Sequence, residues 1–293
     1  MRSPTVLASG LTVSLAAAAF GQASFSGIGD LAGGSFSSMA LGISPDGTRV
    51  VGLGTAAGGT RGVLWSAGTL TPLSDPAGTY TIREAYAISA NGVITGSADG
   101  PNGVEAYKYN LSGPNRFRAL GGAGFTGSAG RGIASNGGTV VGRRENADGS
   151  LEAARWDGPN LSGLGYLDPD FRSSIALGIS ADGITVVGSS DGPEGFRAFV
   201  FAGGFMSLLD APGATQSEAY ACSGNGTIIV GTAAVSGSTN HAARWTNGAF
   251  ADLGEIPGGP DNSGALACSA DGSVIGGYAF DAARSTMDRY NAK

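Results

Sequence analysis

The sequence contains one histidine, His241, and two lysines, Lys108 and Lys293. With so few histidines and lysines, a multi-histidine metal site is excluded and a Ser-Lys pair has few candidates. A Ser-His-Asp triad or a Cys-His pair would have to use His241, and a catalytic histidine needs a base partner or an orienting group nearby. Five related segments of the chain have two arginines, two glutamates and one threonine at the position of His241, so the position accepts either charge. These residues are Arg61, Glu105, Glu152, Arg197 and Thr286. We therefore expect His241 to be a solvent-facing strand residue, and we predict no catalytic, cofactor-binding or metal-binding residues.

Four carboxylates are candidates for acid–base chemistry on a polysaccharide. Asp168, Asp170, Glu84 and Glu218 are predicted to lie in connections that lead into successive repeats. Glycoside hydrolysis uses two carboxyl groups whose separation decides the mechanism. The sequence cannot supply that separation. The glycine-rich stretch 121–124 lacks the Lys-Ser/Thr pair or helix that a phosphate-binding loop requires.

A second repeated polar position precedes a glycine in six segments. The residues are Asp46, Asn91, Asn136, Asp182, Asn225 and Asp271. Calcium normally needs six to eight converging oxygens, and half of these residues are asparagines. Asp-Gly and Asn-Gly pairs tolerate the positive φ of tight hairpins. We therefore interpret these residues as turn formers.

The two cysteines, Cys222 and Cys268, occupy the same repeat position, where other copies have Ile43, Ile88, Ala134 and Ile179. A free cysteine behaves as a small buried hydrophobe. An oxidising compartment would also permit a disulfide, if the two Cα atoms approach within about 7 Å. Their wide spacing does not fit a zinc site.

Composition narrows the class of protein. The net charge is −6 with no basic cluster, which excludes the basic face that a nucleic-acid partner requires. Charged residues make up 14% and hydrophobic residues 42%, as in a folded domain. The 53 glycines show no triplet period and suit many tight turns.

The N-terminus has the features of a secretory signal peptide. Met1-Arg2 is followed by an apolar stretch over 6–20, and Gly21-Gln22-Ala23 supplies small residues for cleavage. We predict a signal peptide over 1–23 and a secreted or periplasmic mature chain over 24–293. No later apolar run is long enough to span a membrane.

The chain is built from a repeat of about 45 residues, seen most clearly in Ala176–Gly188. Each copy contains four short β-prone segments separated by turn residues, as in Ile175–Ser180, Ile184–Ser189, Arg197–Phe201 and Phe205–Leu209. Four antiparallel strands in about 45 residues are typical of one β-propeller blade.

One large side chain per copy is expected to pack between neighbouring blades. These anchors are Trp65, Tyr109, Trp156, Phe201, Trp245 and Tyr290. Other aromatic residues lie in predicted inter-blade connections and are candidates for a contact surface. They are Tyr80, Phe125, Tyr166 and Phe171.

The two ends of the chain are complementary in sequence. The sixth copy ends at Lys293 without a fourth strand, while Phe25–Gly34 is similar to the fourth strand and exit of the fifth copy, Phe250–Gly259. We predict an all-β, six-bladed β-propeller in which the N-terminal strand completes the last blade. A natural chain that continues beyond Lys293 is the alternative.

At the level of motifs, the repeat resembles the HAF-type extracellular repeat of exported bacterial proteins. Asp252-Leu253-Gly254, the Ile-Ser-x-x-Gly-x-Val-Val-Gly hairpins and His241-Ala-Ala-Arg-Trp245 carry the resemblance, which covers nearly all of the mature chain. The resemblance implies export and a repeat architecture. It implies no activity and no catalytic residues, and we predict that the protein needs no cofactor.

Two functions remain open from the sequence. The first is a secreted, non-enzymatic propeller, monomeric, that binds or displays an extracellular protein or glycan. Its connections are of similar length, with no long insertion to host a catalytic site. The alternative is a secreted hydrolase or lyase that uses carboxylates at the central channel. A propeller fold does not separate the two, because it hosts both.

Overall fold

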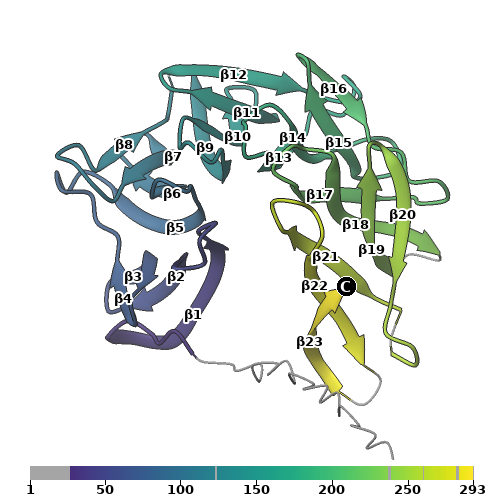
Figure 1. Ribbon diagram of the computed structural model, residues 1–293. Helices are drawn as coiled ribbons and strands as arrows, with labels where there is room; N and C mark the ends of the chain where they lie inside the picture. Colours follow the sequence, from purple (N-terminus) through teal and green to yellow (C-terminus); the bar gives the residue numbers. More distant parts are fainter. Residues whose placement is uncertain (1–26, 123, 237–238, 260, 282–283, 293) are drawn as a thin grey trace, which may run out of the picture.

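The computed structural model describes residues 27–122, 124–236, 239–259, 261–281 and 284–292 (Figure 1). Within these residues the regular secondary structure consists of strands, which form six antiparallel sheets arranged in an arc. We number the sheets as blades 1 to 6 in chain order. The six-bladed β-propeller predicted from the repeat is thereby confirmed.

Each blade is a meander of consecutive strands. Blades 1 to 3 comprise β1 (Gly33–Ile43), β2 (Arg49–Ala56), β3 (Gly59–Ser66), β4 (Thr69–Pro72); β5 (Thr81–Ile88), β6 (Val93–Gly100), β7 (Gly103–Asn110), β8 (Phe117–Ala119); and β9 (Phe125–Ile133), β10 (Thr139–Asn146), β11 (Leu151–Asp157), β12 (Asn160–Gly165). Blades 4 to 6 comprise β13 (Ser174–Ile179), β14 (Val186–Ser190), β15 (Arg197–Ala202), β16 (Phe205–Leu208); β17 (Ser217–Cys222), β18 (Ile228–Ser236), β19 (Thr239–Thr246), β20 (Ala249–Gly254); and β21 (Ser263–Cys268), β22 (Ile275–Asp281), β23 (Arg284–Ala292). The first strands of successive blades contact one another and form the inner wall of the arc (Figure 1).

The repeated hairpin between the first two strands is built as the sequence predicts. In blade 4 the Ser180 hydroxyl donates a hydrogen bond to Asp182 at 2.5 Å and accepts one from the Thr185 amide at 2.9 Å. Gly183 follows with φ of +79°, a conformation that costs a side-chain-bearing residue free energy. The motif Ser-x-Asp/Asn-Gly is therefore a turn.

The hydrophobic core is divided among the blade junctions. Trp156 of blade 3 packs with Ala106 and Leu120 of blade 2, and Trp245 of blade 5 packs with Val187 and Leu209 of blade 4. Both tryptophans are at most 2% exposed. These contacts confirm the anchor role predicted for them. The anchor at Tyr290 lies outside the side chains that the structure describes.

A serine at the start of the first strand joins neighbouring blades by hydrogen bonds. The Ser174 hydroxyl accepts from the Ala153 amide at 2.8 Å and donates to the Gly165 carbonyl at 2.7 Å. Ser263 makes the same pair of bonds to Ala242 and Gly254. Ser128 and Ser217 accept from the corresponding amides at two further junctions. Sequence reasoning missed these serines, because only their position in the fold distinguishes them.

The predicted N-terminal closing strand is not found among the described residues. Within the described residues, blade 6 has three strands, and 27–31 is not part of a sheet. Phe25 and Ser26 lie outside the described residues. Instead, Asp30 accepts a hydrogen bond from the Ser37 amide at 2.7 Å, and the Ser38 hydroxyl donates to the Gly29 carbonyl at 2.9 Å. The segment therefore folds back on β1, where its polar groups are satisfied.

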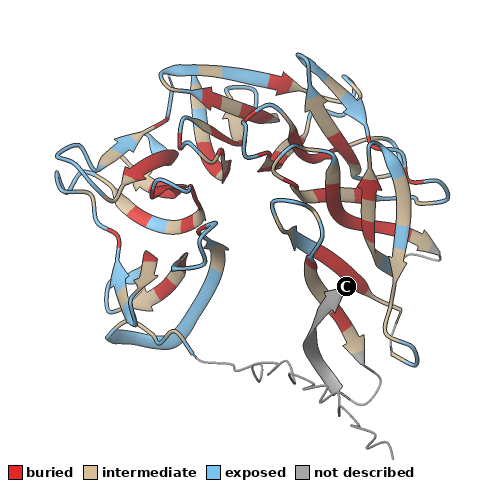
Figure 2. Ribbon diagram, viewed as in Figure 1, coloured by how far each residue is buried: buried red, intermediate tan, exposed pale blue. Residues whose placement is uncertain are grey.

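Most of β1 is exposed to solvent (Figure 2). Ile43 is 61% exposed, whereas Ile88, its counterpart in blade 2, is 6% exposed against the neighbouring blade. Phe36 and Met39 of β1 are also exposed.

The part of the chain that the structure describes contains no helix with the length and hydrophobicity of a membrane span.

Candidate functional site

Because the strands run antiparallel, the links between them alternate between the two ends of the propeller. One end, here called the turn face, holds the hairpins between first and second strands, 44–48, 89–92, 134–138, 180–185, 223–227 and 269–274. The other end, here called the connection face, holds the links between blades, 73–80, 120–124, 166–173, 209–216 and 255–262. The hairpins between second and third strands lie at this same end.

On the turn face, the acidic side chains are engaged by their own hairpins. Hydrogen bonds from the Ser44 hydroxyl and then from Thr48 lower the pKa of Asp46 to about 2. Hydrogen bonds from Ser269 and Ser273 do the same for Asp271, whose pKa is also about 2. These carboxylates stabilise turns, as the sequence predicts.

The two cysteines lie on β17 and β21 as free thiols. Burial raises the pKa of Cys222 to about 12 and that of Cys268 to about 11. Since the thiolate is the reactive form, both are poor nucleophiles at neutral pH.

Glu84 and Glu218 lie on the innermost strands β5 and β17 rather than in connections, which corrects the sequence prediction. Glu84 accepts hydrogen bonds from the Tyr86 hydroxyl at 2.5 Å and the Ser97 hydroxyl at 2.7 Å. Glu218 accepts from the Tyr220 hydroxyl at 2.7 Å and from Ser189. Blades 2 and 5 thus repeat one Glu-Ala-Tyr arrangement.

The tyrosines of this arrangement remain protonated at neutral pH. Burial, and then the hydrogen bond to Glu84, raises the pKa of Tyr86 to about 12. Burial and Glu218 raise the pKa of Tyr220 as well. In blade 2 the Arg131 guanidinium also lies 3.9 Å from the centre of the Tyr86 ring, a cation–π contact.

Asp168 and Asp170 lie in the link between blades 3 and 4, as predicted. The Asp168 carboxylate accepts a hydrogen bond from the Asp170 amide at 2.9 Å. Asp168 therefore shapes the local turn. Within the described part of the chain, neither residue forms a hydrogen bond or ion pair with Glu84 or Glu218.

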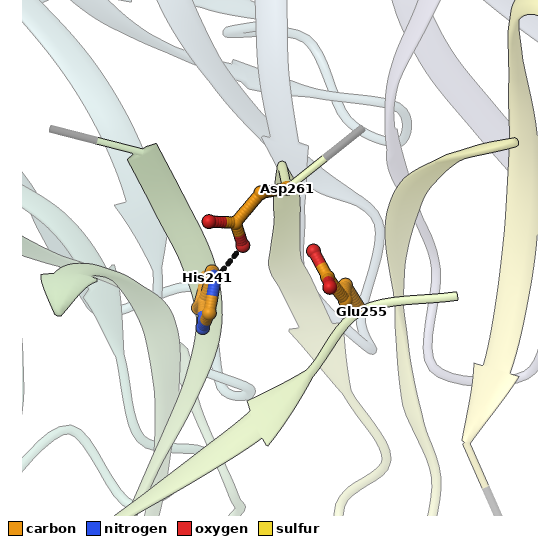
Figure 3. Close-up of side chains that lie close together, drawn as sticks. All are labelled: His241, Glu255 and Asp261. Atoms are coloured by element: carbon orange, nitrogen blue, oxygen red, sulfur yellow. Dashed lines mark hydrogen bonds and ion pairs between the residues drawn. The ribbon is translucent and has the colours of Figure 1, made fainter. Parts of the chain in front are cut away.

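His241 is not the solvent-facing residue that the sequence predicts. Its side chain is 12% exposed, and its ring lies between the carboxylates of Asp252 and Asp261 at the junction of blades 5 and 6. Figure 3 shows His241 with Asp261 and Glu255. Nδ1 lies 2.9 Å from Asp252 Oδ2 on β20, and Nε2 bonds to Asp261 Oδ1 in the following link. Glu255 approaches the same point from the end of β20 (Figure 3).

The charges of this cluster influence one another strongly. Hydrogen bonding to Asp252 raises the pKa of His241, with Asp261 adding to the effect and burial opposing it. The hydrogen bond to His241 lowers the pKa of Asp261. The neighbouring Asp261 carboxyl group raises the pKa of Glu255. One nitrogen and two carboxylate oxygens, from His241, Glu255 and Asp261, lie within 4.8 Å of one another.

A cleft opens on the connection face between blades 2 and 3. Its volume is about 450 Å³ and it is partly open to solvent, a size that suits a small ligand or a short segment of a polymer. Phe125, Val104 and Asn102 line it together with Glu105, which is 8% exposed. Of the predicted contact aromatics, Phe125 lies in this cleft, while Tyr80 donates a long hydrogen bond of 3.4 Å to Glu105.

The remaining two aromatic candidates lie together in the link between blades 3 and 4. Tyr166 is partly buried beside Arg172, whose guanidinium lies 5.8 Å from the ring centre. Phe171 is 37% exposed. This link is a second aromatic patch on the connection face.

No protein-family model matches the chain, and no curated protein matches it either. Among solved structures it is similar to TolB from Acinetobacter baumannii, with a TM-score of 0.54, 15% identity and 84% of this chain covered. The chain spans 61% of the length of that protein. It is also similar to the β-propeller domain of the Trilobed protease from Pyrococcus furiosus, described as having an open velcro topology. That match has a TM-score of 0.56 and 10% identity, and covers 87% of this chain and 78% of the other.

An oligogalacturonate lyase in complex with manganese is similar too, with a TM-score of 0.51 and 13% identity. The match covers 83% of this chain and 70% of the lyase. At these identities the similarity shows the fold alone, which is a β-propeller.

Proposed function

We propose that the chain is an exported, non-enzymatic β-propeller that binds an extracellular or periplasmic protein or glycan through its connection face. The observation that carries the proposal is the cleft between blades 2 and 3. It combines an aromatic ring, Phe125, with polar groups at Asn102 and Glu105 in a concave site of ligand size. Aromatic faces and a few placed polar groups are what sugar rings and extended peptides bind.

The contrast between the two ends of the propeller supports the same proposal. On the turn face the copies are nearly alike, and their Ser and Asp side chains are engaged in hairpin geometry. On the connection face the copies differ, and aromatic and charged side chains gather there. Binding residues are generally found where a rigid scaffold presents variable links.

The test is a glycan-array and pull-down screen of the mature protein, followed by variants against the best partner. Val104, 45% exposed at the cleft, is replaced by arginine to fill the space without removing core contacts. Phe125→Ala removes the aromatic wall. The matched control is Phe205→Ala, because Phe205 is 75% exposed beside the 203–204 turn at the opposite end. We expect loss of binding in the first two variants. Equal effects of Phe205→Ala, or none of Val104→Arg, would contradict the assignment of the face.

Export and membership of the HAF-type repeat family are part of this proposal. The cross-strand pair of His241 and Asp252, 2.9 Å apart, supports the family because these are the polar residues of its two short motifs. The predicted cleavage is tested by expressing the chain in a secreting host. The exported protein is expected to begin at Ser24, and retention of residues 1–23 in it would refute the signal peptide.

A secreted hydrolase or lyase is the second candidate, because Glu84 and Glu218 do place carboxylates on the innermost strands. Each is hydrogen-bonded to a tyrosine and a serine, so each is held in position. Turnover of a polysaccharide that is abolished in both Glu84→Gln and Glu218→Gln would favour this function. Binding without turnover would favour the first.

A further inference from the structure

The clearest unexplained feature outside the cleft is the charge of the His241 cluster. The junction of blades 3 and 4 provides an internal reference, because Ser174 and Ser263 make equivalent bonds at equivalent positions of the two junctions. On that alignment Glu152 corresponds to His241, and Arg172 corresponds to Asp261. The same backbone therefore carries different charges at the two junctions.

At the blade 3 junction the charges are balanced. Arg144 pairs with Glu152 at 2.6 Å, and Arg172 pairs with Asp148 at 2.5 Å. At the blade 5 junction, Asp252, Glu255 and Asp261 surround one histidine. Among the described residues no arginine or lysine forms an ion pair with any of these three carboxylates.

Ligand atoms of three side chains of the cluster converge on one point. One ring nitrogen of His241, an oxygen of Glu255 and an oxygen of Asp261 lie within 4.8 Å of one another. Ligands about 2.0–2.2 Å from a tetrahedral ion are about 3.4 Å apart, so small rotations of these three side chains would bring their atoms to ligand distance. Glu255 Oε2 is shielded from solvent and has no hydrogen-bond partner in the described part of the chain.

Asp252 orients the histidine for this role. A carboxylate accepts hydrogen bonds, so the contacts of Asp252 with Nδ1 and of Asp261 with Nε2 place a proton on each ring nitrogen in the metal-free protein. A metal ion bound at Nε2 would displace the proton there, while Nδ1–H continues to donate to Asp252. A carboxylate behind a histidine is the usual support of a histidine metal ligand. The Thr239 hydroxyl, 3.0 Å from Asp261 Oδ2, steadies the second ligand in the same way.

We propose that His241, Glu255 and Asp261 bind one divalent transition-metal ion, with Zn²⁺ as the best match, at the junction of blades 5 and 6. An imidazole nitrogen with two carboxylates suits Zn²⁺, whereas Mg²⁺ and Ca²⁺ prefer all-oxygen sites. The ion joins β19 of blade 5 to the link that leads into β21, and so braces the three-stranded terminal blade. This inference is independent of the partner bound at the cleft.

The experiment is calorimetric titration of ZnCl₂ into the mature, untagged protein after removal of metals with EDTA. We expect saturable binding of one ion per chain and a higher Tm in its presence, because a ligand of the folded state stabilises it. Ca²⁺ is expected to bind far more weakly than Zn²⁺. Failure to observe one saturable Zn²⁺ site, or equal binding of Ca²⁺, would overturn the proposal.

Variants separate a built site from a merely acidic surface. Glu255→Gln removes a ligand and leaves the metal-free fold intact, because Oε2 bonds to no other described group. It should weaken Zn²⁺ binding more than about 100-fold, as should His241→Gln, since outer-shell changes alone cost about 10–100-fold. Asp252→Asn, a positioning change, should fall in that lower range and keep one site per chain.

The matched control is Asp170→Asn, which removes one exposed carboxylate from the corresponding link of blade 3. Its Zn²⁺ affinity should equal that of the wild type. If Asp170→Asn and Glu255→Gln weaken binding equally, Zn²⁺ is attracted by net charge alone and the site is refuted.

Discussion

Blades 3 and 5 use the same backbone position for opposite chemistry. In blade 3, Glu152 on β11 faces Arg144 across the strand pair, and Gly163 on β12 leaves room for both. In blade 5, His241 on β19 faces the small Ala233, and Asp252 replaces the glycine. The partner of the central side chain has moved from the second strand to the fourth.

This difference shows what the fold requires at the position and what it leaves free. Both central side chains are largely buried, at 13% and 12% exposure, so both need a partner. Either neighbouring strand can supply one. In blade 3, Glu152 is neutralised by Arg144. In blade 5, several carboxylates surround one histidine, so negative charge is left to bind a ligand.

The largest expected loss of stability comes from removing the cation of the Arg144–Glu152 ion pair. In Arg144→Ala the buried Glu152 carboxylate loses its cationic partner, so the free energy of unfolding should fall by about 3–5 kcal/mol. Urea denaturation followed by tryptophan fluorescence measures it. Arg83→Ala is the control, because the Arg83–Asp99 pair is 53% and 36% exposed and should cost less than about 1 kcal/mol. Equal losses would show that burial does not distinguish the pairs.

The next effect tests whether the fourth-strand position must be small in blade 3. A methyl group on Gly163 would lie 2.1 Å from Glu152 Oε1 and 2.6 Å from Arg144 Nη2. Gly163→Ala should therefore lower the free energy of unfolding by about 1–3 kcal/mol, as the ion pair is displaced. Asp252→Ala at the matching site of blade 5 removes a side chain that is 37% exposed, with an expected loss under about 1 kcal/mol. The reverse order of losses would refute the comparison.

A third variant converts the blade 5 junction to the blade 3 charge scheme. Asp261→Arg places a cation where blade 3 has Arg172, beside Asp252 and Glu255. The side chain is 45% exposed, so the metal-free protein should gain up to about 1 kcal/mol while losing Zn²⁺ binding. Thermal unfolding in EDTA and the zinc titration check the two parts. Asp170→Arg, in the balanced link, should give no such gain.

Much of the fold could be predicted because the repeat exposes it. The Ser180-x-Asp182-Gly183 turn and the tryptophan anchors recur in register, so comparison of copies separates structure from function. The closing strand was predicted wrongly for the described residues, since similarity of 25–31 to 250–253 says nothing of Asp30, whose carboxylate is captured by the Ser37 amide.

The site was harder to predict because its signal lies in pairs of positions. His241 aligned with residues of either charge, which suggested solvent exposure. The structure shows that each charge there has a partner from a different strand, as with Arg144 and Asp252. Only the strand register relates Ala233 and Asp252 to His241, and no single repeat position reveals it.

The smallest expected effect is on how the stability of the fold falls at low pH, to which Asp148 at the blade 3 junction contributes. Hydrogen bonds from the Ser150 hydroxyl and amide, and then the contact with Arg172, lower the pKa of Asp148 from 3.8 to about 2. A lowered carboxyl pKa stabilises the fold above the unfolded value, and this contribution is lost as the pH falls from about 4 towards 2. Asp148→Asn should therefore reduce the difference in Tm between pH 5 and pH 2.5. Asp170→Asn is the control, because the Asp170 carboxylate has no such bonds in the described structure, and it should leave that difference unchanged. An equal reduction in both variants would show that net charge, rather than the Asp148 hydrogen bonds, sets the loss of stability in acid.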